Sequence, residues 1–253
     1  MPDYVLTNRE HWDKWAHAWV DGGERGWVGE PSWGIWGIPE TELGLLPDDM
    51  AGMDAIELGC GTGYVSAWMI RRGARVVGID NSEKQLATAR RLAEEHGVDL
   101  TLIHGNAEVV PYPDESFDFA ISEYGVAIWA DPYKWIPEAW RVLRPGGELV
   151  FLGNHPLVMI TQRTDVDEPV KRELLHPYFG MHRIDWDDGE DRGTDFNLTI
   201  SAWHRLFQEV GFEFVAYHEL QSPHRGEEVR FYATADWAND YPTEQVWKLR
   251  KPS

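Results

Sequence analysis

The run at residues 54–63, Asp-Ala-Ile-Glu-Leu-Gly-Cys-Gly-Thr-Gly, constrains the fold of this 253-residue chain more than any other segment. An apolar stretch that ends in alternating glycines is typical of a strand that turns sharply into a helix. Because glycine has no Cβ, Gly59, Gly61 and Gly63 can adopt positive φ and let a ligand approach the backbone. The following helix presents free N–H groups there. The run predicts a nucleotide-cofactor loop, although a glycine run alone also fits a plain turn.

A second apolar strand, at residues 75–80, strengthens this interpretation. It ends in Asp80, which lies 80 − 57 = 23 positions beyond Glu57. An acidic residue about 20 positions after a glycine loop suits the vicinal hydroxyls of a ribose. The glycines are spaced GxGxG, whereas dinucleotide-binding loops have GxGxxG. The two segments therefore favour a mononucleoside-like cofactor over a dinucleotide.

With these motifs, the sequence resembles the class I S-adenosylmethionine-dependent methyltransferases, specifically the group that shares the small-molecule methyltransferase domain. Residues 198–219 resemble that family's closing helix and strand. The resemblance implies a doubly wound, mostly parallel, seven-stranded α/β sheet of Rossmann-like type with an antiparallel last strand. Four motifs carry it in the family's order, at residues 57–63, 78–82, 105–108 with 111–118, and 143–147.

The resemblance also implies how S-adenosylmethionine, and its product S-adenosylhomocysteine, would be held. Backbone groups of residues 59–61 would contact the amino-acid part, and Asp80 would accept both ribose hydroxyl protons. Asn106 and Ala107 would lie at the adenine edge. Asn106 stands where the family usually has aspartate, which puts the strength of its contact in doubt. The expected cofactor-binding residues are Glu57, Gly59, Cys60, Gly61, Gly63, Asp80, Asn81, Gln85, Asn106, Ala107, Glu108 and Glu123.

Methyl transfer from a sulfonium is an in-line displacement, so positioning of the acceptor supplies much of the rate. A general base is needed only where the acceptor must lose a proton. Glu123 and Tyr124 should border the departing sulfur, although Glu123 equally suits a buried structural acid. His155, directly after the expected fifth strand, is the best-placed base by topology. No spacing of His and carboxylate residues matches a compact metal motif, so no metal is expected.

Two segments outside the motifs are expected to select the methyl acceptor. Residues 1–50 are rich in tryptophan, and Trp12, Trp15 and Trp19 recur at helical spacing. That aromatic face either packs on the sheet or forms a lid over the site. Residues 154–198 break the alternation of strands and helices and are interpreted as an inserted cap. The expected substrate contacts are Trp15, Trp19, Trp33, Tyr124, His155, Tyr178 and His182.

The remaining pattern predicts parallel βαβ units. Ser82 is expected to cap the second helix of the core. The predicted regions are an N-terminal lid (1–50), a cofactor-binding core (51–153), the cap (154–198) and a C-terminal completion of the sheet (199–253). Strands are expected near 54–58, 75–79, 99–103, 117–122 and 147–152, with helices at 64–72, 83–96, 132–143 and 199–211, and a closing antiparallel pair near 212–219 and 229–235.

Composition limits the partners and the setting. Lys and Arg number 23 against 43 Asp and Glu, and the formal charge of −20 disfavours binding to nucleic acid and to anionic membranes. Cys60 is the only cysteine, which excludes an intrachain disulfide and favours a cytoplasmic setting. No stretch of the sequence approaches membrane-spanning length. The sequence leaves open whether the protein forms a homodimer.

Together with the resemblance, these features predict an enzyme that transfers a methyl group from S-adenosylmethionine to N or O of a small molecule. One alternative is another transferase that uses the same type of cofactor, such as an aminopropyl transferase. A second is a non-catalytic protein that binds the cofactor. Fold alone does not choose among the three.

Overall fold

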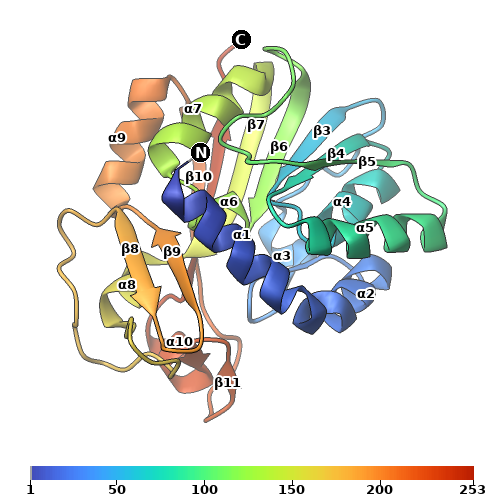
Figure 1. Ribbon diagram of the computed structural model, residues 1–253. Coiled ribbons are helices and arrows are strands. Elements are labelled where there is room, and N and C mark those ends of the chain that lie inside the picture. Colours follow the sequence, from blue (N-terminus) through green and yellow to red (C-terminus); the bar gives the residue numbers. More distant parts are fainter. Residues whose placement is uncertain (1) are drawn as a thin grey trace.

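The computed structural model describes residues 2–253 and is built on one central seven-stranded sheet (Figure 1). The strand order is β10-β13-β7-β6-β3-β4-β5. The strands of the parallel part are β3 (Asp54–Leu58), β4 (Arg75–Asp80), β5 (Leu100–His104), β6 (Phe117–Glu123) and β7 (Leu143–Asn154). β13 (Glu244–Arg250) lies between β7 and β10 (Glu213–Leu220) and is antiparallel to both. The predicted fold class is confirmed.

The last strand comes from a different segment than predicted. Residues 229–235 supply only the two-residue strands β11 (Val229–Arg230) and β12 (Ala233–Thr234) of a small hairpin, which leads into helix α10 (Ala235–Asp240). The prediction was wrong because β13 does not look like an inner strand. Its first residues, Glu244 and Gln245, are polar yet buried: Oε1 of Glu244 accepts from the N–H of Ile35, and the Gln245 amide donates to Asn154 O.

Helices cover both faces of the sheet. Alternate residues of a strand point to opposite faces, so Ala55 packs with helix α4 (Tyr64–Arg71) while Ile56 packs with helices α7 (Pro132–Val142) and α9 (Ile200–Val210). Helix α5 (Glu83–His96) begins at Ser82, whose hydroxyl accepts from the N–H of Gln85 at 3.2 Å. The predicted N-cap of this helix, Ser82, is therefore confirmed. The short helix α6 (Val126–Trp129) follows β6.

The N-terminal segment divides into parts that pack differently. Helix α1 (Asp3–Trp15) and the 3-10 turn η1 (Ala16–Trp19) cross the sheet's lower end, while helix α2 (Val20–Val28) packs on α4 and α5 (Figure 1). Residues from 33 to 50, with β1 (Ser32–Trp33), β2 (Ile38–Pro39) and α3 (Glu40–Leu43), contribute apolar side chains to the core beside α4. Part of the segment that was predicted as a lid therefore belongs to the core.

The cap region contains helix α8 (Pro156–Thr161) and an antiparallel hairpin of β8 (Arg183–Asp187) and β9 (Arg192–Phe196). The hairpin packs against α1. Within residues 2–253, no helix combines the length and the apolar character needed to cross a bilayer.

Candidate cofactor and substrate site

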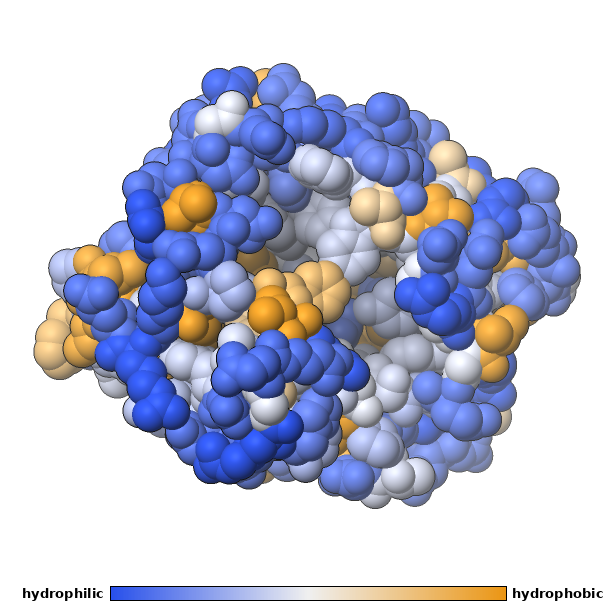
Figure 2. All heavy atoms as spheres, turned by 90° about the horizontal axis from the view of Figure 1, so that it is seen from below, coloured by the Kyte–Doolittle hydropathy of each residue, from blue (hydrophilic) through white to orange (hydrophobic). Residues whose placement is uncertain are grey.

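The carboxyl ends of β3, β4 and β6 gather the predicted site residues at one edge of the sheet. Figure 2 looks at the molecule from this end and shows a hollow that contains pale and orange residues and is surrounded by hydrophilic ones. Open α/β sheets bind ligands at this edge, because the loops that follow neighbouring strands diverge there.

Asp80 is prepared to accept hydrogen bonds from a ligand. Its Oδ2 accepts from the N–H of Gly61 at 2.8 Å, and its Oδ1 accepts from the N–H of Ser82 at 2.7 Å. Each carboxylate oxygen keeps a lone pair for a further donor. Burial raises the pKa of Asp80, against the two N–H donors that lower it. A Cβ built on Gly61 would meet no atom within 4 Å, so the space above this loop is open. These groups fit the ribose of a nucleoside cofactor.

Gly59 serves the packing of the loop. Its φ is +76°, and a Cβ there would lie 2.7 Å from Cα of Gly125 and 2.9 Å from N of Val126. The loop after β3 and the loop after β6 therefore touch backbone to backbone. Cys60 is buried with its sulfur against Gly78, and burial raises the pKa of its thiol. That environment suits a space-filling residue rather than a nucleophile.

Several predicted cofactor residues make structural contacts. The buried carboxyl of Glu57 accepts from the N–H of Ser66 at 2.8 Å, at the start of α4, and burial raises its pKa to about 8. Oδ1 of Asn106 accepts from the backbone N–H of Glu108, and Nδ2 of Asn106 donates to the Glu108 carboxylate. The side-chain oxygen of buried Gln85 has no hydrogen-bond partner among residues 2–253, which leaves an acceptor at the start of α5.

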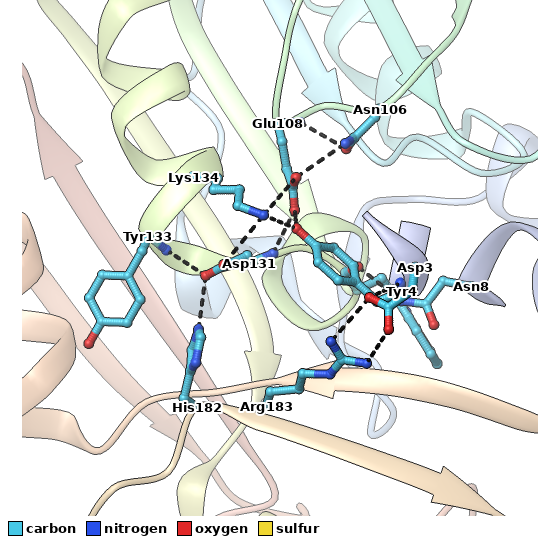
Figure 3. Close-up of polar contacts among 11 residues, drawn as sticks. Asp3, Tyr4, Asn8, Asn106, Glu108, Asp131, Tyr133, Lys134, His182 and Arg183 are labelled. Atoms are coloured by element: carbon cyan, nitrogen blue, oxygen red, sulfur yellow. Dashed lines mark hydrogen bonds and ion pairs between the residues drawn. The ribbon is translucent and has the colours of Figure 1, made fainter. Parts of the chain in front are cut away.

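Glu108 is the centre of a network that joins the core, α1 and the cap (Figure 3). Its Oε1 accepts from the Tyr4 hydroxyl at 2.6 Å and from the N–H of Asp131 at 2.9 Å. Lys134 donates to the same hydroxyl at 2.6 Å, and His182 of the cap lies 2.9 Å from Asp131. In this structure Glu108 and His182 therefore hold elements together.

Further contacts tie α1 directly to the Asp80 turn. The Arg9 guanidinium donates to Oδ1 of Asn81 at 2.7 Å, and the amide of Asn81 donates to Val5 O at 2.8 Å. Ser82 donates its hydroxyl to Asp13 at 2.6 Å. The predicted cofactor residue Asn81 thus uses its side chain to hold α1 across the turn.

Glu123 and Tyr124 begin a second polar cluster where β6 ends. Glu123 accepts from the Tyr64 hydroxyl and from the N–H of Gly34, the latter at 3.3 Å. Tyr124 has a positive φ of 54° and donates its hydroxyl to Glu244 at 2.6 Å. A tyrosine in this backbone region is uncommon and marks a position held by its surroundings. Burial raises the pKa of both carboxyl groups, that of Glu244 to about 8.

The structure does not bring the other predicted substrate contacts together. Trp33 is fully buried in the core and donates to Glu40, which leaves it no surface for a ligand. Tyr178 lines a surface groove with Tyr217 and Trp247 on the outer strands of the sheet. Trp15 donates its indole N–H to Asp191, and Trp19 stacks on Phe231.

His155 is oriented away from a role as general base. Its Nδ1 accepts from the N–H of Leu157 at 3.1 Å and so caps helix α8. The proton must then sit on Nε2, which lies 3.1 Å from Oε1 of Glu219. Burial lowers the pKa of His155, against the carboxylate that raises it. Both ring nitrogens are engaged, so this side chain is better described as a helix cap.

His155→Ala should therefore lower the free energy of unfolding by about 1–2 kcal/mol, the cost of a lost cap. Binding of S-adenosylhomocysteine should stay within about twofold, since the ring reaches none of the groups around Asp80. Chemical denaturation and calorimetry on the same variant check both parts. A large loss of ligand affinity with unchanged stability would contradict the capping role.

Sequence reasoning missed the partners that complete both clusters. Tyr4 and Arg9 come from α1. Gly34 lies in the loop between β1 and β2, Tyr232 in the β11–β12 hairpin, and Glu244 in β13, the strand that was not predicted. No spacing rule links these residues to Glu123. A correct assignment of β13 would have found one of them, because its first residue lies at the same sheet edge as the end of β7.

The comparisons with known proteins agree with this geometry. A family model described as a methyltransferase domain matches residues 56–151. A demethylmenaquinone methyltransferase of Clavibacter sepedonicus is 38% identical over 209 residues, which cover 76% of this chain and 79% of the relative. The chain belongs to the class I S-adenosylmethionine-dependent methyltransferases. The alignments with four other curated relatives cover 34% to 54% of each relative, so the chain spans about a third to a half of their length.

Solved structures show the fold of this methyltransferase family over nearly the whole chain. An S-adenosylmethionine-dependent methyltransferase of Mesorhizobium loti has a TM-score of 0.64 at 23% identity, over 86% of this chain and 100% of that one. The cyclase SpnF also has a TM-score of 0.64, at 21% identity over 98% of this chain and 97% of its own. The methyltransferase fold is therefore compatible with more than one chemistry.

Proposed function

We propose that this chain binds S-adenosylmethionine at Asp80 and transfers its methyl group to a nitrogen or oxygen of a small molecule. The observation that carries the proposal is the Asp80 carboxylate, fixed by the N–H groups of Gly61 and Ser82 beside an open glycine loop. Bound there, the cofactor would supply an electrophilic methyl group on a sulfonium. The family membership supports the same reading, and enzymes of this type form class EC 2.1.1.

The chain's own residues would divide the work of binding and positioning. Backbone groups of Gly59, Cys60 and Gly61 would contact the amino-acid part, and Ala107 would lie at the adenine edge. Glu123, at the end of β6, would face the methyl acceptor. The side chains of Asn81 and Glu108 bond to α1, and that of Asn106 bonds to Glu108. Only the backbone groups of these three residues are therefore proposed as cofactor contacts. No metal is proposed, and residues 2–253 contain no group of three or more His, Cys, Asp or Glu side chains placed to hold one.

The regions predicted from the sequence remain proposals in revised form. Residues 51–153 and 199–253 form the sheet, α1 with η1 acts as the lid, and residues 154–198 act as the cap. The charge of −20 supports a small-molecule acceptor over nucleic acid or an anionic membrane. The single cysteine supports a cytoplasmic setting.

Calorimetric titration with S-adenosylhomocysteine tests the proposal. A dissociation constant in the micromolar range or lower is expected, with a single site per chain. Absence of binding by a folded protein at millimolar ligand would refute the cofactor assignment. Incubation with methyl-labelled S-adenosylmethionine and pooled metabolites then separates the alternatives, since a non-catalytic binder transfers no label and an aminopropyl transferase prefers the decarboxylated cofactor.

A further inference from the structure

Glu244 is a buried carboxylate with an unused oxygen. Its side chain is 0% exposed, and Oε1 accepts from the N–H of Ile35 at 2.9 Å and from the Tyr124 hydroxyl at 2.6 Å. Oε2 has no hydrogen-bond partner among residues 2–253. A buried polar atom without a partner is unfavourable unless something else binds it. The position therefore suits a hydrogen-bond donor that comes from outside the chain.

The Glu244 carboxylate packs against Gly34, the glycine whose N–H is bonded to Glu123. A Cβ built on Gly34 would collide with Oε1 of Glu244 and would lie 2.7 Å from its Cδ and 2.8 Å from Oε2. The N–H of Gly34 donates to Oε1 of Glu123 at 3.3 Å. Both carboxylates thus lie against one glycine, where the Glu244 carboxylate takes up the room that a side chain would need. Glu123, Gly34 and Tyr64 are each only partly buried, so the cluster around Glu123 extends to the surface.

The chain supplies no counter-ion for the two carboxylates. Neither Glu123 nor Glu244 forms an ion pair with a Lys, Arg or His in the described part of the chain, and the charge of Glu123 adds to the burial that raises the pKa of Glu244. Arg230 of the adjoining hairpin donates instead to Glu228 and to Ile35 O. A buried and a partly buried carboxyl group without a cation are costly when both are ionised, and a bound cation would relieve that cost.

Tyr232 joins this cluster to a chain of aromatic rings that begins at its neighbour in the sequence. The hydroxyl of Tyr232 lies 2.9 Å from that of Tyr124. Its neighbour Phe231, with a positive φ of 52° and 61% exposed, stacks on Trp19 of the lid at 5.7 Å between centroids. Trp12 packs on Trp19 in turn. Aromatic faces attract cations as well as apolar groups.

We propose that the methyl acceptor is an amine, bound as its ammonium ion between Glu123 and Glu244 beneath the aromatic rim of Trp19 and Phe231. This rests on the proposed methyl transfer and names its substrate class. The ammonium group would donate to Oε2 of Glu244 and to Glu123. Tyr64, Tyr124 and Tyr232 would position the carboxylates, because their hydroxyls are the groups that contact them or one another.

The proposed step balances in atoms and charge. The Glu123 carboxylate takes one proton from the ammonium ion, which frees the nitrogen lone pair. A bond forms between nitrogen and the methyl carbon while the bond from that carbon to sulfur breaks. The electron pair of the broken bond stays on sulfur. The products are neutral S-adenosylhomocysteine, protonated Glu123 and a methylated ammonium ion.

The test compares amines with alcohols of the same carbon skeleton on the protein saturated with S-adenosylhomocysteine. Calorimetry would use 2-phenylethylamine against 2-phenylethanol, together with aliphatic and polyamine pairs. At least one amine is expected to bind about tenfold or more tightly than its alcohol, the effect of a hydrogen bond to a charged group. If every alcohol binds as well as its amine while S-adenosylhomocysteine still binds, the amine assignment is overturned and the proposed function stands.

Glu244→Gln supplies the matched variant, since its amide oxygen can keep the contacts to Ile35 and Tyr124. We expect this change to remove the amine's advantage and to leave the affinity for S-adenosylhomocysteine within about twofold. Glu148→Gln is the control and should leave amine binding unchanged, because Glu148 lies in the middle of β7 and pairs with Arg250, at the far end of β13 from Glu244. Unaltered amine binding by a folded Glu244→Gln would also overturn the assignment. The comparison on the unsubstituted protein stays decisive if the variant does not fold.

Discussion

Asp80→Ala is expected to lower the affinity for S-adenosylhomocysteine about 100-fold or more while the protein stays folded. A carboxylate that accepts from both ribose hydroxyls makes two charge-assisted hydrogen bonds, each worth about 1.5–3 kcal/mol. The same side chain also fixes the N–H groups of Gly61 and Ser82, so the glycine loop loses its anchor. Calorimetric titration of the purified variant measures the change.

Asp54→Ala is the matched control for that experiment. Asp54 lies at the opposite end of β3, where it pairs with Arg75 and Arg144. Its removal should affect stability modestly, since these ion pairs are largely exposed, and should leave ligand affinity unchanged. Equal ligand affinity in Asp80→Ala and the unsubstituted protein would show that the ribose is held elsewhere.

Gly59→Ala should lower the stability of the protein, whereas Gly61→Ala should lower its affinity for the ligand, although the two glycines are only two positions apart. A Cβ on Gly59 would lie 2.7 Å from the backbone of Gly125, so the loops after β3 and β6 could not keep their contact. We expect this variant to lose about 3 kcal/mol or more of stability, from backbone strain and overpacking together. Thermal unfolding measures the loss.

Gly61→Ala should fold, because a Cβ there meets nothing within 4 Å. Its φ of +50° costs an alanine about 1 kcal/mol. The added methyl group would occupy space proposed for the cofactor, so affinity for S-adenosylhomocysteine should fall about tenfold or more. A stable Gly61→Ala that binds the ligand normally would place the cofactor away from this loop.

The parallel part of the fold was predictable because its signals are local. The glycine run, the apolar strand before Asp80 and the cap at Ser82 each reflect a geometry that neighbouring residues determine. β13 lacks such a signal. It lies between β7 and β10, which both precede it in the chain, and its buried Glu244 and Gln245 bond to Ile35 and Asn197 in distant segments.

Some site residues could likewise be predicted from the sequence, and others could not. Asp80 could be assigned from its position after a strand, and its hydrogen bonds in the structure are consistent with that role. The substrate contacts could not be assigned, because tryptophan spacing shows that a face is aromatic without showing what covers it. Trp33 lies in the core and His155 caps a helix, whereas the polar cluster around Glu123 depends on residues that only tertiary structure brings together.

The attachment of α1 has a consequence for the rate of turnover. Arg9 and Asp13 attach the helix to Asn81 and Ser82, the two residues after Asp80, and Tyr4 attaches its beginning to Glu108. A nucleoside held by Asp80 would leave only when several of these bonds break together. Such cooperative openings of a helix occur over microseconds to milliseconds or longer. Product release would then limit the rate of the catalytic cycle, and the opening of α1 would determine that rate.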